Sequence, residues 1–213
     1  MIIQDKDKVQ IQNRLADMAG KVHLVYFTQE LECQFCHETG QLLRQVNAMS
    51  DKLSLDIHNF QLDKEKTNQY KIDKIPATVV VAEKDYGIRF FGVPAGYEFA
   101  TLLEDIIAVS RGDSGLNDST REQLKAVTKP VHIQVLVTPT CPYCPVAVRS
   151  AHAFAIENDN ITADMVEITE FPHLAHKYNV RGVPKTVINE DIFIEGAVPE
   201  NSLLEKVLEA ATE

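Results

Sequence analysis

The chain has 213 residues, of which 45% are apolar and 24% are charged, so it can form an apolar core in one large domain or two small ones. The formal net charge of -10 argues against nucleic acid and anionic membrane surfaces as partners, because both would repel the chain. The sequence lacks a run of 18 apolar residues, and charges stand near its start where a signal peptide needs an apolar run. We therefore expect a cytoplasmic protein without a membrane span.

The first half is predicted to alternate between helices and short strands. Residues 5–19 have the periodicity of an amphipathic helix, and the apolar run 22–28 is typical of a buried strand. The further elements expected are a helix after Cys36, a strand at 53–60, a short helix ending near Tyr70, strands at 77–82 and 87–91, and a helix at 97–109.

The second half is predicted to repeat this order. Residues 111–118 are rich in turn formers and form the expected linker, and Ser119 to Glu122 fit a capping box that would open the next helix. The elements expected are strands at 131–137, 161–168, 186–188 and 192–194, and helices at 143–157, 172–178 and 200–211. Each half is then an α/β unit of βαβ followed by ββα, with boundaries at 1–115 and 116–213.

Three landmarks recur at one offset and indicate a tandem duplication. The pairs, each 108 residues apart, are Cys33 with Cys141, Tyr70 with Tyr178, and Pro76 with Pro184. The four cysteines of the chain form two C-x-x-C pairs, Cys33 with Cys36 and Cys141 with Cys144. In a reducing compartment such pairs are more often catalytic or metal-binding than structural.

Both halves resemble thioredoxin folds, because a C-x-x-C lies between a first strand and a helix, and Ile-Pro or Val-Pro opens a later strand. The sequence CPYC, residues 141–144, is the motif found in glutaredoxins. With CQFC first and CPYC second, the chain resembles the glutaredoxin-like protein disulfide oxidoreductases. This resemblance implies two tandem thioredoxin-like units that carry out dithiol exchange without a cofactor.

The resemblance also implies that Pro76 and Pro184 are cis and face the cysteines. A cis X-Pro bond costs only about 0.5–1 kcal/mol. It would expose the backbone of Ile75 and Val183, which could pair with an extended substrate. The alternative is an ordinary trans proline at the start of a strand.

One feature departs from the thioredoxin pattern. Phe27 and Val135 stand six residues before the first cysteine of each pair, where thioredoxins carry a buried aspartate. Proton transfer must therefore use another group or water.

The position of each pair before a helix suggests how the chemistry would run. The nucleophile is a thiolate, and unpaired N–H groups at a helix start stabilise the anion. Cys33 and Cys141 would attack, and Cys36 and Cys144 would resolve the mixed disulfide. Pro142 suits the first helical turn because its missing N–H loses no partner there.

The charges around the two pairs differ. Glu30 and Glu32 precede Cys33, and like charge disfavours a thiolate, whereas Lys185 follows Pro184 in the second half. We therefore expect Cys141 to have the lower pKa and to attack substrates faster. The alternative is that these side chains point into water and are screened within about 8–10 Å.

The function predicted is that of a protein thiol–disulfide oxidoreductase with a part in cell redox homeostasis. It would reduce, form or isomerise disulfides in protein substrates, with a direction that depends on reduction potentials. The resemblance suggests a thioredoxin-reductase-like flavoprotein as electron donor. Two alternatives are a chaperone-like peptide-binding module with incidental dithiols, and a component that relays electrons to a peroxidase.

Two metal-bound alternatives fit the sequence less well. Residues 33–37 match the C-x-x-C-H of a haem attachment site, but no export signal accompanies them. A zinc site shared by both pairs would need a spacing of about 15–20 residues between them, which is far shorter than the spacing here. We therefore predict no metal site.

Overall fold

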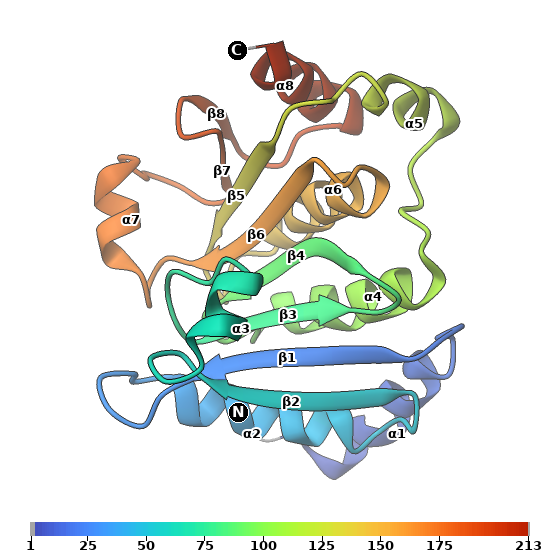
Figure 1. Ribbon diagram of the computed structural model, residues 1–213, viewed down its shortest axis with the longest axis vertical. Helices are drawn as coiled ribbons and strands as arrows, with labels where there is room; N and C mark the ends of the chain where they lie inside the picture. The colour runs from blue at the N-terminus through green and yellow to red at the C-terminus, as the bar shows by residue number, and fades with distance from the viewer. Residues whose placement is uncertain (1–2, 213) are drawn as a thin grey trace.

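A computed structural model describes residues 3–212, which form one eight-stranded sheet flanked by helices on both faces (Figure 1). The first half contains α1 (Asp5–Leu15), β1 (Val22–Thr28), α2 (Cys36–Asn47), β2 (Leu53–Asn59), α3 (Lys64–Gln69), β3 (Ala77–Val81), β4 (Asp85–Phe91) and α4 (Glu98–Arg111). The second half contains α5 (Asp118–Leu124), β5 (Val131–Val137), α6 (Cys144–Glu157), β6 (Ile161–Glu167), α7 (Pro172–Lys177), β7 (Lys185–Ile188), β8 (Ile192–Glu195) and α8 (Glu200–Thr212). The fold class predicted from the sequence, two tandem thioredoxin-like units, is confirmed.

Several local details differ from the sequence-based expectation, and α1 ends at Leu15 rather than at residue 19. Helix α5 begins at Asp118, one residue before the expected capping box, because the side chain of Asn117 accepts a hydrogen bond from the Thr120 N–H at 2.9 Å. Helix α6 begins only at Cys144, so Pro142 lies in the turn before it, and the proline of the first helical turn is Pro145.

The two halves join through a parallel pairing of β4 with β6. The strand order is β2-β1-β3-β4-β6-β5-β7-β8, so β2 and β8 are the outer strands of the sheet. Helices α4 and α6 also pack against each other beside this junction (Figure 1). The expected boundary between residues 115 and 116 falls between α4 and α5, and residues 1, 2 and 213 of the predicted units lie outside the described residues.

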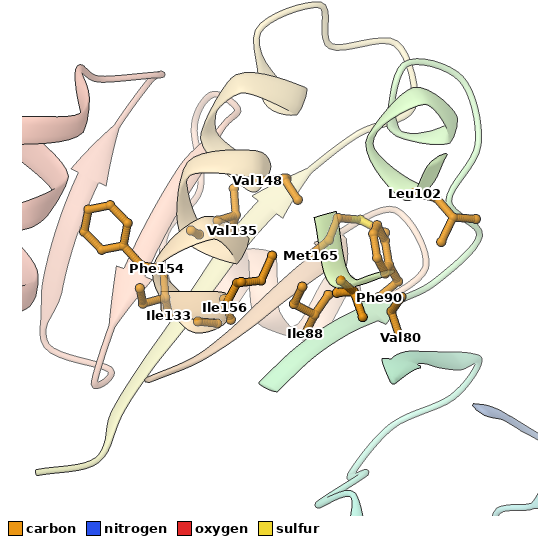
Figure 2. Packing of buried hydrophobic residues seen from close by; sticks show 14 of the residues in the cluster. Val80, Ile88, Phe90, Leu102, Ile133, Val135, Val148, Phe154, Ile156 and Met165 are labelled. Carbon is orange, nitrogen blue, oxygen red and sulfur yellow. The ribbon is translucent and has the colours of Figure 1, made fainter. Parts of the chain in front are cut away.

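The hydrophobic core crosses the junction between the halves. Val80, Ile88 and Phe90 of the first half pack in one cluster with Met165 and Phe154 of the second (Figure 2). A smaller cluster lies on the face covered by α7 and includes Phe27, Phe91 and Leu136. Strands covered on both faces are rich in apolar residues along their whole length, as the runs 22–28 and 131–137 are.

Within residues 3–212, every helix falls short of the length and apolar character needed to cross a membrane.

Candidate active sites

Both C-x-x-C pairs lie at the same edge of the sheet. Strands β1, β4, β6 and β5 run in one direction, so the carboxyl ends of β1 and β5 face the same side (Figure 1). Four strand spacings of about 4.8 Å separate β1 from β5, which places the two pairs roughly 19 Å apart along this edge. The two C-x-x-C pairs therefore form two separate centres, and strands β3, β4 and β6 lie between them.

The first centre is a disulfide between Cys33 and Cys36, with a sulfur–sulfur distance of 2.00 Å. Cys33 is half-buried in the turn before α2, and Cys36 is buried as the first residue of that helix. The buried Tyr26 hydroxyl donates a hydrogen bond to the Cys36 carbonyl at 2.5 Å and ties the start of α2 to β1.

The second centre is a disulfide between Cys141 and Cys144, with a sulfur–sulfur distance of 2.14 Å. Both cysteines are buried, at 6% and 0% exposure. The Cys144 N–H donates to the Cys141 Sγ at 3.1 Å, so a backbone donor already points at the sulfur that would become a thiolate. The first cysteines of the two centres therefore differ in exposure, because Cys33 is half-buried and Cys141 is buried.

The two expected prolines directly precede β3 and β7. The Ile75–Pro76 and Val183–Pro184 bonds are cis, as predicted. The Val183 carbonyl lies 3.7 Å from Cys141 Sγ, so this backbone faces the second centre. Each proline carbonyl accepts a hydrogen bond from a later glycine N–H, at 2.9 Å in the first half and 2.8 Å in the second. Ile75 and Val183 are both half-buried.

The side chains expected to modulate the cysteines have contrasting surroundings. Glu30 and Glu32 are exposed, and within residues 3–212 neither forms an ion pair. Lys185 is buried, and its Nζ forms an ion pair with Glu195 Oε1 at 2.9 Å and lies 5.1 Å from the centre of the Phe193 ring. Its charge is therefore largely compensated by Glu195.

Two carboxyls near the junction of the halves were not singled out from the sequence, that of the buried Glu98 and that of the half-buried Glu170. Burial raises the pKa of Glu98 at the start of α4 to about 7. Burial also raises the pKa of Glu170 to about 7, although the Val93 N–H donates to its Oε1 at 2.7 Å. The sequence shows neither, because each carboxyl loses its water only when the two halves pack together.

A buried histidine–aspartate pair lies between α4 and α6. His152 Nδ1 and Asp105 Oδ2 are 2.6 Å apart, and the His152 side chain is fully buried. The His152 ring also meets the Phe90 ring edge-on at 5.1 Å between centroids. His152 on α6 therefore links the second half to α4 of the first half.

No group of three or more His, Cys, Asp and Glu side chains is arranged to hold a metal ion within residues 3–212. The four cysteines are instead joined as two disulfides in separate centres.

Comparisons with known proteins agree with this geometry. The family model described as "Thioredoxin domain" matches residues 131–209. The structure of a protein disulfide oxidoreductase from Aeropyrum pernix is 32% identical, with a TM-score of 0.94 over 100% of this chain and 95% of that chain. The structure of the N-terminal domain of alkylhydroperoxide reductase AhpF from Enterococcus faecalis is 25% identical, with a TM-score of 0.89 over 97% of this chain and 100% of that one.

Curated relatives are longer proteins. The AhpF protein of the alkyl hydroperoxide reductase of Staphylococcus aureus is 26% identical over 200 residues, which cover 94% of this chain and 36% of that protein. A protein named "NADH dehydrogenase" of Bacillus subtilis is 23% identical over 166 residues, which cover 78% of this chain and 30% of that protein. The chain thus spans about a third of the length of these relatives. With its two disulfides, its doubled fold and a relative of matching length, the chain belongs to the family of protein disulfide oxidoreductases built from two thioredoxin-like units.

Proposed function

We propose that the chain is a thiol–disulfide oxidoreductase that reduces, forms or isomerises disulfides in protein substrates. In the reducing direction, a thiolate of Cys33 or Cys141 attacks a substrate disulfide and releases one substrate thiolate, which takes up a proton. Cys36 or Cys144 then attacks the mixed disulfide and releases the second substrate thiol. Two electrons and two protons pass to the substrate, and the protein disulfide forms; the oxidising direction is the reverse.

One observation carries this proposal: each C-x-x-C disulfide stands at the start of a helix. At the second centre, the Val183 carbonyl also lies 3.7 Å from Cys141 Sγ, so the backbone before the cis proline adjoins the sulfur that a substrate would approach. We propose that Ile75, Pro76, Val183 and Pro184 form the substrate-binding segments, by backbone pairing with an extended polypeptide.

The proton balance of the reaction needs a group near the resolving cysteines. The aspartate position of thioredoxins is occupied by Phe27 and Val135, which cannot titrate. Another group or water must therefore take up and return this proton.

The proposed electron donor is a thioredoxin-reductase-like flavoprotein. Support comes from the longer relatives, in which a region similar to this chain is joined to further sequence. We further propose residues 1–115 and 116–213 as the two units, each with its own dithiol.

A second candidate function is electron relay to a peroxidase. The similarity to the AhpF protein of alkyl hydroperoxide reductase, over 94% of this chain, favours it. The relay would use the same dithiols, with a peroxidase disulfide in place of a general protein substrate. A chaperone-like role with incidental dithiols is the alternative to both.

Insulin reduction with dithiothreitol as electron source tests the principal proposal. Wild-type protein should accelerate it, variants with Cys→Ser in one pair should retain part of the rate, and the variant with all four cysteines replaced should lose it. If that last variant still promotes refolding of a reduced substrate as well as wild type, the chaperone-like role is correct instead. Hydroperoxide consumption in the presence of a thioredoxin reductase and a peroxidase distinguishes the relay.

A further inference from the structure

A groove beside the first centre has no occupant among the described residues. Its volume is about 770 Å³. It lies between the loop that leads to Cys33 and the loop that follows β2, at the outer end of the sheet. The residues lining it are Gln29, Glu30, Leu31, Glu32, Asn59, Gln61 and Leu62.

In the second half, the place that corresponds to this groove is occupied by residues of the first half, namely β4 and the chain that follows it. Strand β6, the counterpart of β2 at the 108-residue offset, pairs in parallel with β4. The chain after β4 then crosses the second centre's loops. The Val93 N–H donates to Glu170 Oε1 at 2.7 Å, and the Tyr97 N–H donates to the Pro139 carbonyl at 3.2 Å. In the second half, the place of the groove is therefore taken by a segment of the first half, residues 92–97, which follows the paired strand β4.

The fit of that segment is close. Gly96 lies so near that a Cβ there would stand 2.1 Å from the Pro139 carbonyl oxygen, and a Cβ at Gly92 would stand 2.9 Å from Glu170 Oε1. In the first half, β2 pairs with β1 and packs on α2, and its other edge has no strand partner within residues 3–212. The duplication thus shows one copy of the groove filled and the other open.

In the open groove, leucines occupy the two positions whose counterparts in the second half form hydrogen bonds to residues 93 and 97. Leu62 stands at the offset of Glu170, and Leu31 stands two residues before Cys33 as Pro139 stands two before Cys141. These leucines are 81% and 78% exposed, the two highest values among the large hydrophobic side chains of the described residues. Such exposure beside a strand edge is typical of a surface that a partner buries.

The negative charge of two glutamates that line the groove indicates what kind of segment could bind there. Glu30 and Glu32 flank Leu31, are exposed, and form no ion pair within residues 3–212. Two unpaired carboxylates favour a positively charged segment. A second copy of this chain fits poorly, because its net charge is also -10.

We propose that this groove and the outer edge of β2 dock an extended segment of a partner protein that carries apolar and basic residues in alternation. The segment would pair in parallel with β2, as β4 pairs with β6, and its side chains would contact Leu31, Leu62 and the two glutamates. A segment bound there lies next to Cys33. The role of that partner as a disulfide-exchange partner rests on the proposed function, but the docking itself does not.

The test is binding of a short cysteine-free peptide of alternating Val and Lys to the oxidised full chain. We expect the peptide to bind, to slow amide hydrogen exchange in Leu53–Asn59, and to bind more weakly as salt rises. The same peptide with Glu in place of Lys should give no protection. Replacing both glutamates, Glu30→Gln with Glu32→Gln, should weaken binding about three- to tenfold.

The matched control is Glu83→Gln with Glu205→Gln, which removes the same charge from positions outside the groove and should leave binding unchanged. Equal binding of the Lys and Glu peptides, or unchanged binding in the Glu30/Glu32 variant, would overturn the proposal. So would self-association of the wild-type chain that Ile57→Lys on β2 abolishes, since a second copy would then be the occupant. Because the peptide has no cysteine, failure of insulin reduction leaves this result intact.

Discussion

The two redox centres come from one duplicated unit, yet their surroundings differ. The first stands beside an open groove and the outer edge of the sheet, and Cys33 is half-buried. The second is enclosed by the segment after β4, and Cys141 is buried with a backbone N–H pointing at its sulfur. The difference indicates that the junction between the units, rather than the C-x-x-C motif, sets how exposed the first cysteine of each centre is.

The largest expected effect comes from breaking the buried pair that holds the units together. Asp105→Ala should lower the free energy of unfolding by about 3–5 kcal/mol, because it leaves His152 buried without its partner. Urea unfolding measures this. The exposed pair Lys84–Asp159 also links the two halves, and Asp159→Ala should cost only about 0–1 kcal/mol. Similar costs for both variants would mean that the buried pair does not hold the junction.

The next effect concerns the segment that fills the second groove. Gly96 has φ of 61°, and a Cβ there would stand 2.1 Å from the Pro139 carbonyl oxygen, so Gly96→Ala adds a clash to the cost of the left-handed backbone. Gly115 has φ of 68° and open space around it, which makes Gly115→Ala the control. We expect Gly96→Ala to lose about 1–3 kcal/mol more than Gly115→Ala in thermal or urea unfolding.

The same variant probes access to the second centre. In reduced protein, Gly96→Ala should speed alkylation of Cys141 relative to Cys33, since its clash loosens the enclosing segment. An unchanged ratio of the two alkylation rates in a folded variant would show that this segment does not shield Cys141.

A smaller effect should appear in the pH dependence of stability. The pKa of Glu98 is raised from 4.5 to about 7 by burial, so folding favours its protonated form. The resulting stabilisation is fully present below about pH 4.5 and is lost as the pH rises through 7. Glu98→Gln should remove roughly 2–3 kcal/mol of this pH dependence between pH 5 and 8, as measured by urea unfolding at each pH.

The control for that measurement is Glu83, for which Glu83→Gln should leave the pH dependence as in wild type. If Glu98→Gln also leaves it unchanged, Glu98 is not the group that titrates on unfolding.

The smallest effect concerns the thiols themselves. We expect the pKa of Cys33 to exceed that of Cys141, because Glu30 and Glu32 lie near Cys33 while the Cys144 N–H donates to Cys141 Sγ. Iodoacetamide rates against pH in variants that retain one pair measure both values. Glu30→Gln with Glu32→Gln should speed alkylation of Cys33 about two- to fivefold at neutral pH. A more acidic Cys33 in the wild-type protein would contradict this expectation.

Much of the fold followed from local patterns. Strands β1 and β5 match their predicted limits of 22–28 and 131–137, because continuous apolar runs between turn signals are a property of the local sequence. The equal spacing of Cys33 to Pro76 and Cys141 to Pro184 predicted two matching centres, and the resemblance to thioredoxin folds implied that both prolines are cis. The structure has both features. The limits of α5 and α6 were less accurate, since helix starts depend on individual caps such as Asn117.

The sequence alone therefore determined the duplication and the positions of the two dithiols, which depend on spacing along the chain, and the resemblance to thioredoxin folds implied the type of each unit. Tertiary structure decided how the units join, since pairing β4 with β6 brings together strands of different units that carry no local signal for each other. That junction leaves Glu98 buried and Glu170 half-buried, and it fills one groove while leaving its copy open. The ion pair between Lys185 and Glu195 likewise forms only in the folded structure, where β7 pairs with β8. Burial and pairing between distant segments set pKa values and access, and these appear only when the chain is folded.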